Sequence, residues 1–322
     1  MVSMGQQELH AMVSELSRQV RSAVRPMLGS ERAKGFAGQG ASGDATFGID
    51  EVAEQVAEDF LGRRGNIASY TEDRGLVVRG DADLVLVIDP IDGTRPAAAG
   101  LESCCISVAA APFEKDRAHL LTLGDVFFGM VTEIKNQVVF SAFKGGGARI
   151  ESQGALTKPP ASRSTGIDSM FWTLGFRGRP AEPLITVLSG LVDASSVGGG
   201  CFDLGSATFG ITRVVMGEMD VYVDVGQRMA DENALVRRMF LELGRGAILN
   251  NYPYDVAAAA LIAAEAGMVV TDALGKPLDG YALIPSGGGG QVSAVVSSNP
   301  GLHRQVIDEL DRGMARLNRR YR

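Results

Sequence analysis

The sequence predicts a protein of the α/β class, and three observations lead to that class. Apolar residues recur at helical spacing in the first thirty residues, and a short apolar run at 83–88 has the length of a buried strand. Helix and strand patterns then alternate through the second half. Of the 322 residues, 45% are hydrophobic and 21% are charged, which is ordinary for a globular protein with a sizeable core.

The first half should begin with two helices and continue as strands. Leu9, Met12, Leu16 and Val20 lie at helical spacing, which predicts a helix over 6–27. A glycine-rich loop at 35–43 and a helix at 50–62 follow. We expect strands at 83–88, 105–111, 126–133 and 138–143, the last two as a hairpin. The first of these should end at Asp89, because the proline and glycine that follow favour a tight loop.

The second half is expected to form a separate subdomain. A stretch of low periodicity at 152–165 contains proline and serine, so we place the boundary there and expect subdomains 1–155 and 156–322. The predicted helices cover 205–217, 233–243, 255–267 and 300–317. The predicted strands cover 220–225, 268–271 and 292–297.

Composition excludes several classes of function. The net charge of −7 argues against a nucleic-acid binder, whose surface is basic. No apolar run is long enough to cross a membrane and no signal peptide is recognisable, so we expect a cytoplasmic protein without membrane partners. Three cysteines, two of them adjacent, do not indicate a disulfide framework, and three histidines far apart in the sequence do not indicate a histidine-rich metal site.

Carboxylates at the ends of predicted elements are the most informative feature. Asp89 and Asp92 directly follow a buried strand, and clustered buried carboxylates need a cation to cancel their charge. Oxygen ligands alone favour Mg²⁺ over Zn²⁺. Each acidic residue also has a structural explanation: Asp89 and Asp92 as turn residues, Glu72 as a solvated charge, and Asp50 and Asp255 as N-caps of helices.

Several segments resemble motifs of the inositol monophosphatase superfamily. The stretch 89–94, Asp-Pro-Ile-Asp-Gly-Thr, resembles its first signature, and 254–267, beginning Tyr-Asp-Val-Ala-Ala, resembles its second. The segments 44–50 and 71–73 resemble the acidic blocks upstream of the first signature. The segment 205–207 followed by 220–222 resembles a further family block, so the similarity covers nearly the whole chain in family order.

The resemblance implies a fold and a site. The fold is a layered α-β-α-β-α sandwich of the sugar phosphatase type. The implied ligands of two or three Mg²⁺ ions are Glu72, Asp89, the Ile91 carbonyl, Asp92 and Asp255. Asp50 and Thr94 would orient and deprotonate the attacking water, with Glu72 as the third catalytic residue. The residues implied to bind phosphate or the rest of the substrate are Asp92, Gly93, Thr94, Ser206, Asp224 and Asp255.

The function that the resemblance implies is Mg²⁺-dependent hydrolysis of a small phosphate monoester, such as an inositol phosphate or another sugar or polyol phosphate. Fructose 1,6-bisphosphate, histidinol phosphate and a nucleotide 3′-phosphate are alternative substrates. A catalytically silent regulator that binds metal or phosphate is an alternative of another class. Lithium sensitivity and a homodimer are further family expectations.

One segment departs from the family pattern. Residues 227–252 intervene between Asp224 and the second signature, where inositol-specific members have only a few residues. The insertion could cover the substrate pocket and set specificity, or it could be a peripheral helix or a dimer contact. The sequence leaves these two interpretations equal.

Overall fold

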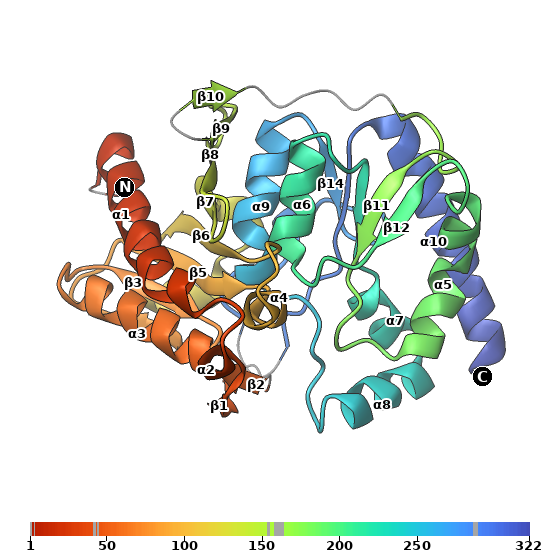
Figure 1. The fold of residues 1–322 in the computed structure, drawn as a ribbon, viewed down its shortest axis with the longest axis horizontal. Coiled ribbons are helices and arrows are strands. Elements are labelled where there is room, and N and C mark those ends of the chain that lie inside the picture. The colour runs from red at the N-terminus through yellow and green to blue at the C-terminus, as the bar shows by residue number, and fades with distance from the viewer. Residues whose placement is uncertain are drawn as a thin grey trace.

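The computed structural model describes residues 2, 4–40, 43, 45–152, 155–157, 164–285 and 289–322. Helices and sheets alternate across the molecule in five layers (Figure 1). From one side to the other these are helices α1 and α3, an eight-stranded sheet, helices α6 and α9, a five-stranded sheet, and helices α5 and α10. The predicted α-β-α-β-α sandwich is therefore confirmed.

The first layer covers the outer face of the large sheet. It contains α1 (Gln6–Val24), which continues as a 3₁₀ turn at Arg25–Met27, the short α2 (Glu31–Lys34), and α3 (Gly48–Gly62). Leu9, Leu16 and Phe60 from these helices pack against the sheet in one buried cluster. In the expected glycine-rich loop, β1 (Phe36–Gln39) pairs with β2 (Ala45–Phe47), which the sequence did not predict.

The large sheet has the strand order β10-β9-β8-β7-β6-β5-β3-β4. Its strands are β3 (Ala68–Thr71), β4 (Gly75–Val78), β5 (Leu84–Asp92), β6 (Cys105–Pro112), β7 (Phe128–Glu133), β8 (Val138–Phe143), β9 (Ala148–Ser152) and β10 (Ala155–Thr157). Strands β3 and β5 pair in parallel, and their neighbours are antiparallel. Both faces of the sheet are covered, which explains why β5 is a continuous apolar run: Leu86 and Ile88 face one core, Val85 and Val87 the other.

Strand β5 is longer than predicted. It continues through Pro90 to Asp92, with irregular pairing to β6 between Asp89 and Asp92. The expected end at Asp89 is therefore wrong, because a bulge accommodates the proline without ending the strand. Gly93, at φ 93°, then turns the chain into the short helix α4 (Thr94–Ala99). A left-handed residue at this position favours glycine.

The middle layer contains α6 (Ala207–Val215) and α9 (Pro253–Glu265), which lie between the two sheets. Helix α9 is rich in alanine and buried almost all round, as expected for a helix covered on both sides. It approaches the large sheet closely: a Cβ atom added at Gly129 would lie 2.8 Å from the Ala258 carbonyl oxygen. Small residues on both elements therefore fix the position of this helix.

The small sheet has the order β12-β11-β13-β15-β14, with strands β11 (Phe171–Leu174), β12 (Gly200–Phe202), β13 (Val221–Val223), β14 (Val269–Thr271) and β15 (Val295–Ser297). Helices α5 (Ala181–Ala194) and α10 (Pro300–Arg320) cover its outer face. The additional helices α7 (Gly226–Glu232) and α8 (Ala234–Leu243) contribute Met229, Ala230 and Phe240 to the same core.

Two expectations about the chain as a whole have different outcomes. The subdomain boundary at 155/156 stays a prediction: β10 spans it, and part of 152–165 lies outside the described residues. Within the described residues, no helix is both long enough and apolar enough to cross a membrane.

Candidate active site

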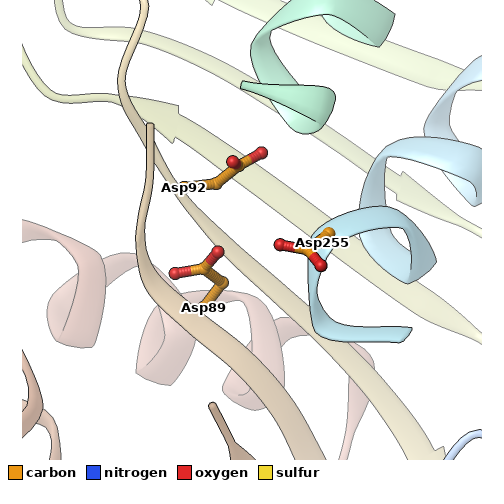
Figure 2. A group of neighbouring side chains, drawn as sticks. All are labelled: Asp89, Asp92 and Asp255. Carbon is orange, nitrogen blue, oxygen red and sulfur yellow. The ribbon is translucent and has the colours of Figure 1, made fainter. Parts of the chain in front are cut away.

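Three carboxylates converge where β5 ends and α9 begins. Figure 2 shows Asp89 and Asp92, from the end of β5, facing Asp255 from the first turn of α9. One carboxylate oxygen from each lies within 4.8 Å of the others. Asp89 and Asp92 are buried and Asp255 is half-buried. Closely spaced carboxylates shielded from water are a donor set that suits a hard divalent cation.

The electrostatics of this trio are unfavourable without a cation. Burial raises the pKa of Asp89 well above its usual value, and the charges of Asp92, Asp255 and Glu72 raise it further. Burial also raises the pKa of Asp255, to about 8, with Asp92 as the next cause. The pKa of Asp92 is raised by burial, although hydrogen bonds from Thr208 and Ser206 oppose this. A bound cation would remove the repulsion, so the residues present fit a metal.

Beside the three carboxylates, the Thr94 hydroxyl and the Asp50 carboxylate form a hydrogen-bonded pair. The Thr94 hydroxyl donates to Asp50 Oδ1 at 2.8 Å and lies 3.2 Å from the Ile91 carbonyl oxygen. The other Asp50 oxygen, Oδ2, accepts the backbone N–H of Phe47 at 2.9 Å. Because the Thr94 proton is given to Asp50, lone pairs of the Thr94 oxygen remain available to accept a proton from water.

Asp50 and Asp255 occupy equivalent positions on their helices, and neither is an N-cap as the structural explanation supposed. Each is the third residue of its helix and accepts the N–H of the residue before the helix, Phe47 for α3 and Tyr252 for α9. One carboxylate oxygen is thereby fixed by the helix start. Both residues also line the cavity, so a structural role and a place in the site coexist.

One cavity, of about 50 Å³, collects most of the predicted site residues. Its walls include Asp50, Glu72, Asp89, Ile91, Asp92, Gly93, Thr94 and Asp255. Glu72 lies in the turn between β3 and β4, and its neighbour Asp73 accepts the Thr46 hydroxyl at 2.9 Å. Ser206 caps α6 and lines an adjoining cavity, where its oxygen accepts the Phe209 N–H at 3.0 Å.

Asp224 is placed differently from the prediction of direct substrate binding. It has no exposed surface, and it does not line either cavity. One carboxylate oxygen is paired with the guanidinium of Arg179, and the other accepts the Gly226 N–H at 2.8 Å. Asp224 therefore holds Arg179, which lines the second cavity, and its contact with a substrate stays a prediction.

The insertion at 227–252 is mainly peripheral. Helices α7 and α8 lie at the lower end of the small sheet in Figure 1 and contribute side chains to the core on its outer face. Its end nevertheless reaches the site, because Leu249, Asn250 and Asn251 line the second cavity. A role of the insertion in substrate specificity stays a prediction.

Three residues of the site were missed in the sequence. Glu54 lines the first cavity one helical turn after Asp50, and burial raises its pKa to about 7. The four-residue spacing from Asp50 could have revealed it. Thr208 donates its N–H to Asp92 at 2.6 Å. Arg177 lines both cavities, and no local pattern marks it as a site residue.

Comparison with known proteins shows the family of this chain. The model of the inositol monophosphatase family matches residues 6–312. The fructose-1,6-bisphosphatase/inositol-1-monophosphatase of Methanothermobacter thermautotrophicus is 27% identical over 302 residues, covering 92% of this chain and 94% of that protein. The bifunctional NADP phosphatase/NAD kinase of Methanocaldococcus jannaschii is 23% identical over 90% of this chain, but only 48% of that longer protein is covered.

Solved structures show the same fold. The inositol monophosphatase of Thermotoga maritima has a TM-score of 0.66 at 20% identity, covering 96% of this chain and 98% of that chain. The extragenic suppressor protein SuhB from Bartonella henselae has a TM-score of 0.67 at 16% identity, covering 95% and 98%.

Proposed function

Because the chain belongs to the inositol monophosphatase family, and is thus a phosphoric monoester hydrolase, we propose that it hydrolyses a small sugar or polyol phosphate in a Mg²⁺-dependent reaction. The observation that carries the proposal is the meeting of the Asp89–Asp92–Asp255 trio with the Thr94–Asp50 pair in one cavity. The trio suits a cation and the pair suits a proton acceptor, which are the two requirements of phosphate ester hydrolysis by water.

The proposed metal ligands are Glu72, Asp89, the Ile91 carbonyl, Asp92 and Asp255, for two or three ions. Bound there, Mg²⁺ would lower the pKa of a coordinated water, neutralise the phosphate dianion and stabilise the leaving oxygen. The protein fixes these ligands by its secondary structure, since Asp92 accepts the Thr208 N–H and Asp255 accepts the Tyr252 N–H.

The Thr94 hydroxyl is proposed to accept a proton from the attacking water while its own proton, which already points to Asp50, passes to that carboxylate. Asp50 would stabilise the charge that develops on this pair, and its other oxygen is anchored at the start of α3. The backbone N–H groups of Gly93 and Thr94 would hold phosphate oxygens, because they follow the sharp turn at Gly93.

The test is phosphate release from a panel of substrates, with and without Mg²⁺. The panel includes inositol 1-phosphate, fructose 1,6-bisphosphate, histidinol phosphate and a nucleotide 3′-phosphate, with Asp92→Asn as the inactive control. We expect release that requires Mg²⁺ and is lost in the variant. Absence of release from every substrate would favour the silent metal- or phosphate-binding regulator.

Two finer expectations accompany this proposal. By resemblance to the family, we expect a homodimer, which light scattering of the purified chain would test. We also expect Li⁺ to inhibit by competing at the ion position near Asp255, which the same phosphate-release assay would test.

A further inference from the structure

The turn between β3 and β4 carries Glu72, one of the proposed metal ligands, and lies against helix α3. This turn comprises residues 71–75, from the end of β3 to the start of β4. Helix α3 carries Asp50, which accepts the Thr94 hydroxyl. Because Glu72 and Asp50 both line the first cavity, the contacts that join the turn to the helix also fix the spacing of these two carboxylates.

Glu54 joins the two elements. It lies on α3 one helical turn after Asp50, so both side chains share one face of the helix. The residue is only 5% exposed, and it lines the same cavity. Hydrogen bonds from the Thr71 side chain and from the Asp73 backbone act on its carboxylate. Since Thr71 and Asp73 flank Glu72, the helix holds the turn on both sides of the proposed ligand.

Further contacts close the turn around the same residues. The Thr71 hydroxyl oxygen accepts the Arg74 N–H at 3.2 Å, so this hydroxyl links Glu54 to the backbone of the turn. The Arg74 Nε atom lies 3.5 Å from Glu54 Oε2. A terminal nitrogen of Arg74 donates to Gln55 Oε1 at 3.2 Å. Charge and hydrogen bonding therefore both attach the turn to α3.

Folding stability alone does not explain a carboxylate at this position. Burial raises the pKa of Glu54 to about 7, so its charged form is unfavourable where it lies. Its Oε1 atom is buried and has no hydrogen-bond partner among the described residues. A buried polar atom without a partner costs free energy on folding. The contacts of Glu54 therefore indicate a role in holding the site more than a net contribution to stability.

We propose that Glu54 is a positioning residue, which holds the turn at 71–75 against α3 and thereby places Glu72 relative to Asp50. The inference rests on the proposed Mg²⁺-dependent function and adds a residue that orients one ligand of the cation. Substituting a residue that orients a metal ligand typically changes metal affinity or activity by about 10- to 100-fold. We therefore expect Mg²⁺ affinity to depend on the reach of the Glu54 side chain and not on its charge.

Two substitutions of Glu54 separate reach from charge. Glu54→Gln keeps an oxygen that can accept from Thr71 and Asp73 but loses the charge, whereas Glu54→Asp keeps the charge and is one methylene group shorter. Isothermal titration calorimetry measures Mg²⁺ binding to each variant without substrate. We expect Glu54→Asp to weaken Mg²⁺ binding about tenfold or more, and Glu54→Gln to bind Mg²⁺ nearly as tightly as the wild-type protein. The reverse order, or equal affinity in the two variants, would overturn the proposal.

Thr71 provides an independent test, which carries the proposal if a Glu54 variant does not fold. Thr71→Val removes the hydroxyl and keeps the shape of the side chain, so Mg²⁺ binding should weaken, and Thr71→Ser should restore most of it. In the double variant Thr71→Val/Glu54→Asp, the loss of binding free energy should be smaller than the sum of the single losses, because both substitutions break one contact. Wild-type affinity in Thr71→Val, or additive losses, would contradict that contact.

Glu58→Ala is the matched control. Glu58 lies one turn further along α3, is paired with Arg79, and does not line the cavity. A general loosening of α3 would weaken Mg²⁺ binding in this variant too, whereas we expect wild-type affinity. In the phosphate-release assay, Glu54→Asp should raise the Mg²⁺ concentration for half-maximal activity, while KM for the phosphate ester at saturating Mg²⁺ stays nearly unchanged. Equal weakening in Glu58→Ala would overturn the specific role of Glu54.

Calorimetry also separates this inference from the catalytic proposal. If the variants bind Mg²⁺ in the expected order but no substrate is hydrolysed, the positioning role holds and only the proposed reaction fails. If Mg²⁺-dependent phosphate release is observed but Mg²⁺ affinity is the same in all variants, only the positioning role fails. If the wild-type protein binds no Mg²⁺, both fail.

Discussion

The active-site region has an acidic wall, formed by Asp89, Asp92 and Asp255, and a basic wall, formed by Arg179 and its partners. The two walls differ in how their buried charges are neutralised. On the acidic wall, Asp89, Asp92 and Asp255 bring one oxygen each within 4.8 Å of the others. Burial raises the pKa of all three, and neighbouring carboxylates raise the pKa of Asp89 and Asp255 further. On the basic wall, the buried Arg179 is matched by Asp224 and by three further oxygen acceptors. The charges of the first wall need a cation that the chain does not contain, whereas the charge of Arg179 is matched by Asp224 within the chain.

This difference predicts that the acidic wall serves cation binding, whereas the basic wall serves the stability of the fold. A carboxylate of the acidic wall destabilises the folded chain until a cation arrives, and the cation supplies the chemistry. A charge on the basic wall stabilises the local structure and positions the turn at 175–179. Substitutions on the two walls should therefore have different consequences for activity and folding, and the predictions below test that contrast.

The largest expected effect is a loss of folding stability when the basic wall is changed. Asp224→Ala leaves the buried guanidinium of Arg179 without its carboxylate, so the free energy of unfolding should fall by about 3–5 kcal/mol. Urea unfolding followed by circular dichroism measures this. The double variant Asp224→Ala/Arg179→Met removes both charges and should recover part of the loss. A loss below ~1 kcal/mol in the single variant would contradict a stabilising pair.

The next effect is on the acidic wall and concerns activity. Asp92→Asn removes one ligand charge, so kcat at saturating Mg²⁺ should fall at least about a hundredfold, or about 2.7 kcal/mol of barrier. Asp193→Asn, at an exposed position on α5, is the matched control and should retain activity. Near-normal turnover of Asp92→Asn would refute its place among the metal ligands.

The proton acceptor can be tested separately from the metal. Thr94→Val removes the hydroxyl that donates to Asp50 while keeping the shape of the side chain, and kcat should fall about a hundredfold. Thr94→Ser keeps the hydroxyl and should recover most of the activity. If Val and Ser variants are equally active, the hydroxyl has no part in the reaction.

The smallest effect is a pH dependence of stability. The pKa of Asp255 is near 4 in an unfolded chain and about 8 in the metal-free folded protein. The folded state thus binds more protons in this window, so the melting temperature without metal should fall as pH rises from about 4 to 8. Added Mg²⁺ should stabilise more at pH 8 than at pH 6. Asp255→Asn should flatten the metal-free profile, and an unchanged slope would contradict this origin.

The acidic wall was largely predictable from the sequence, because its residues lie in short motifs at element ends. Asp89 and Asp92 follow one buried strand, and Asp255 begins one helix. What the motif could not reveal was the local geometry. The strand continues through Pro90, and Asp50 and Asp255 are the third residues of their helices. The sequence did not distinguish this position from the N-cap, because an acidic residue at either one leaves a similar pattern.

The basic wall was not predictable, because its contacts join distant parts of the chain. Arg179 meets Asp224 and Asn251, which are 45 and 72 residues away. Asp224 at the end of a strand resembled a site residue, and nothing in its neighbourhood indicated that an arginine would cover it. The pairing of β11 with β13 brings the turn and the aspartate together, and this pairing is set by the whole sheet.

The close packing of α9 against the large sheet should influence how tightly the carboxylate trio binds a cation. Asp255 belongs to α9, whereas Asp89 and Asp92 belong to β5, so the spacing of the trio depends on how deeply this helix sits. Gly129, on β7, limits that depth through its contact with Ala258. A methyl group added at Gly129 would push α9 away from the sheet and increase the distances between Asp255 and the two aspartates of β5. A buried apolar position would thereby change the affinity of the site for its cation.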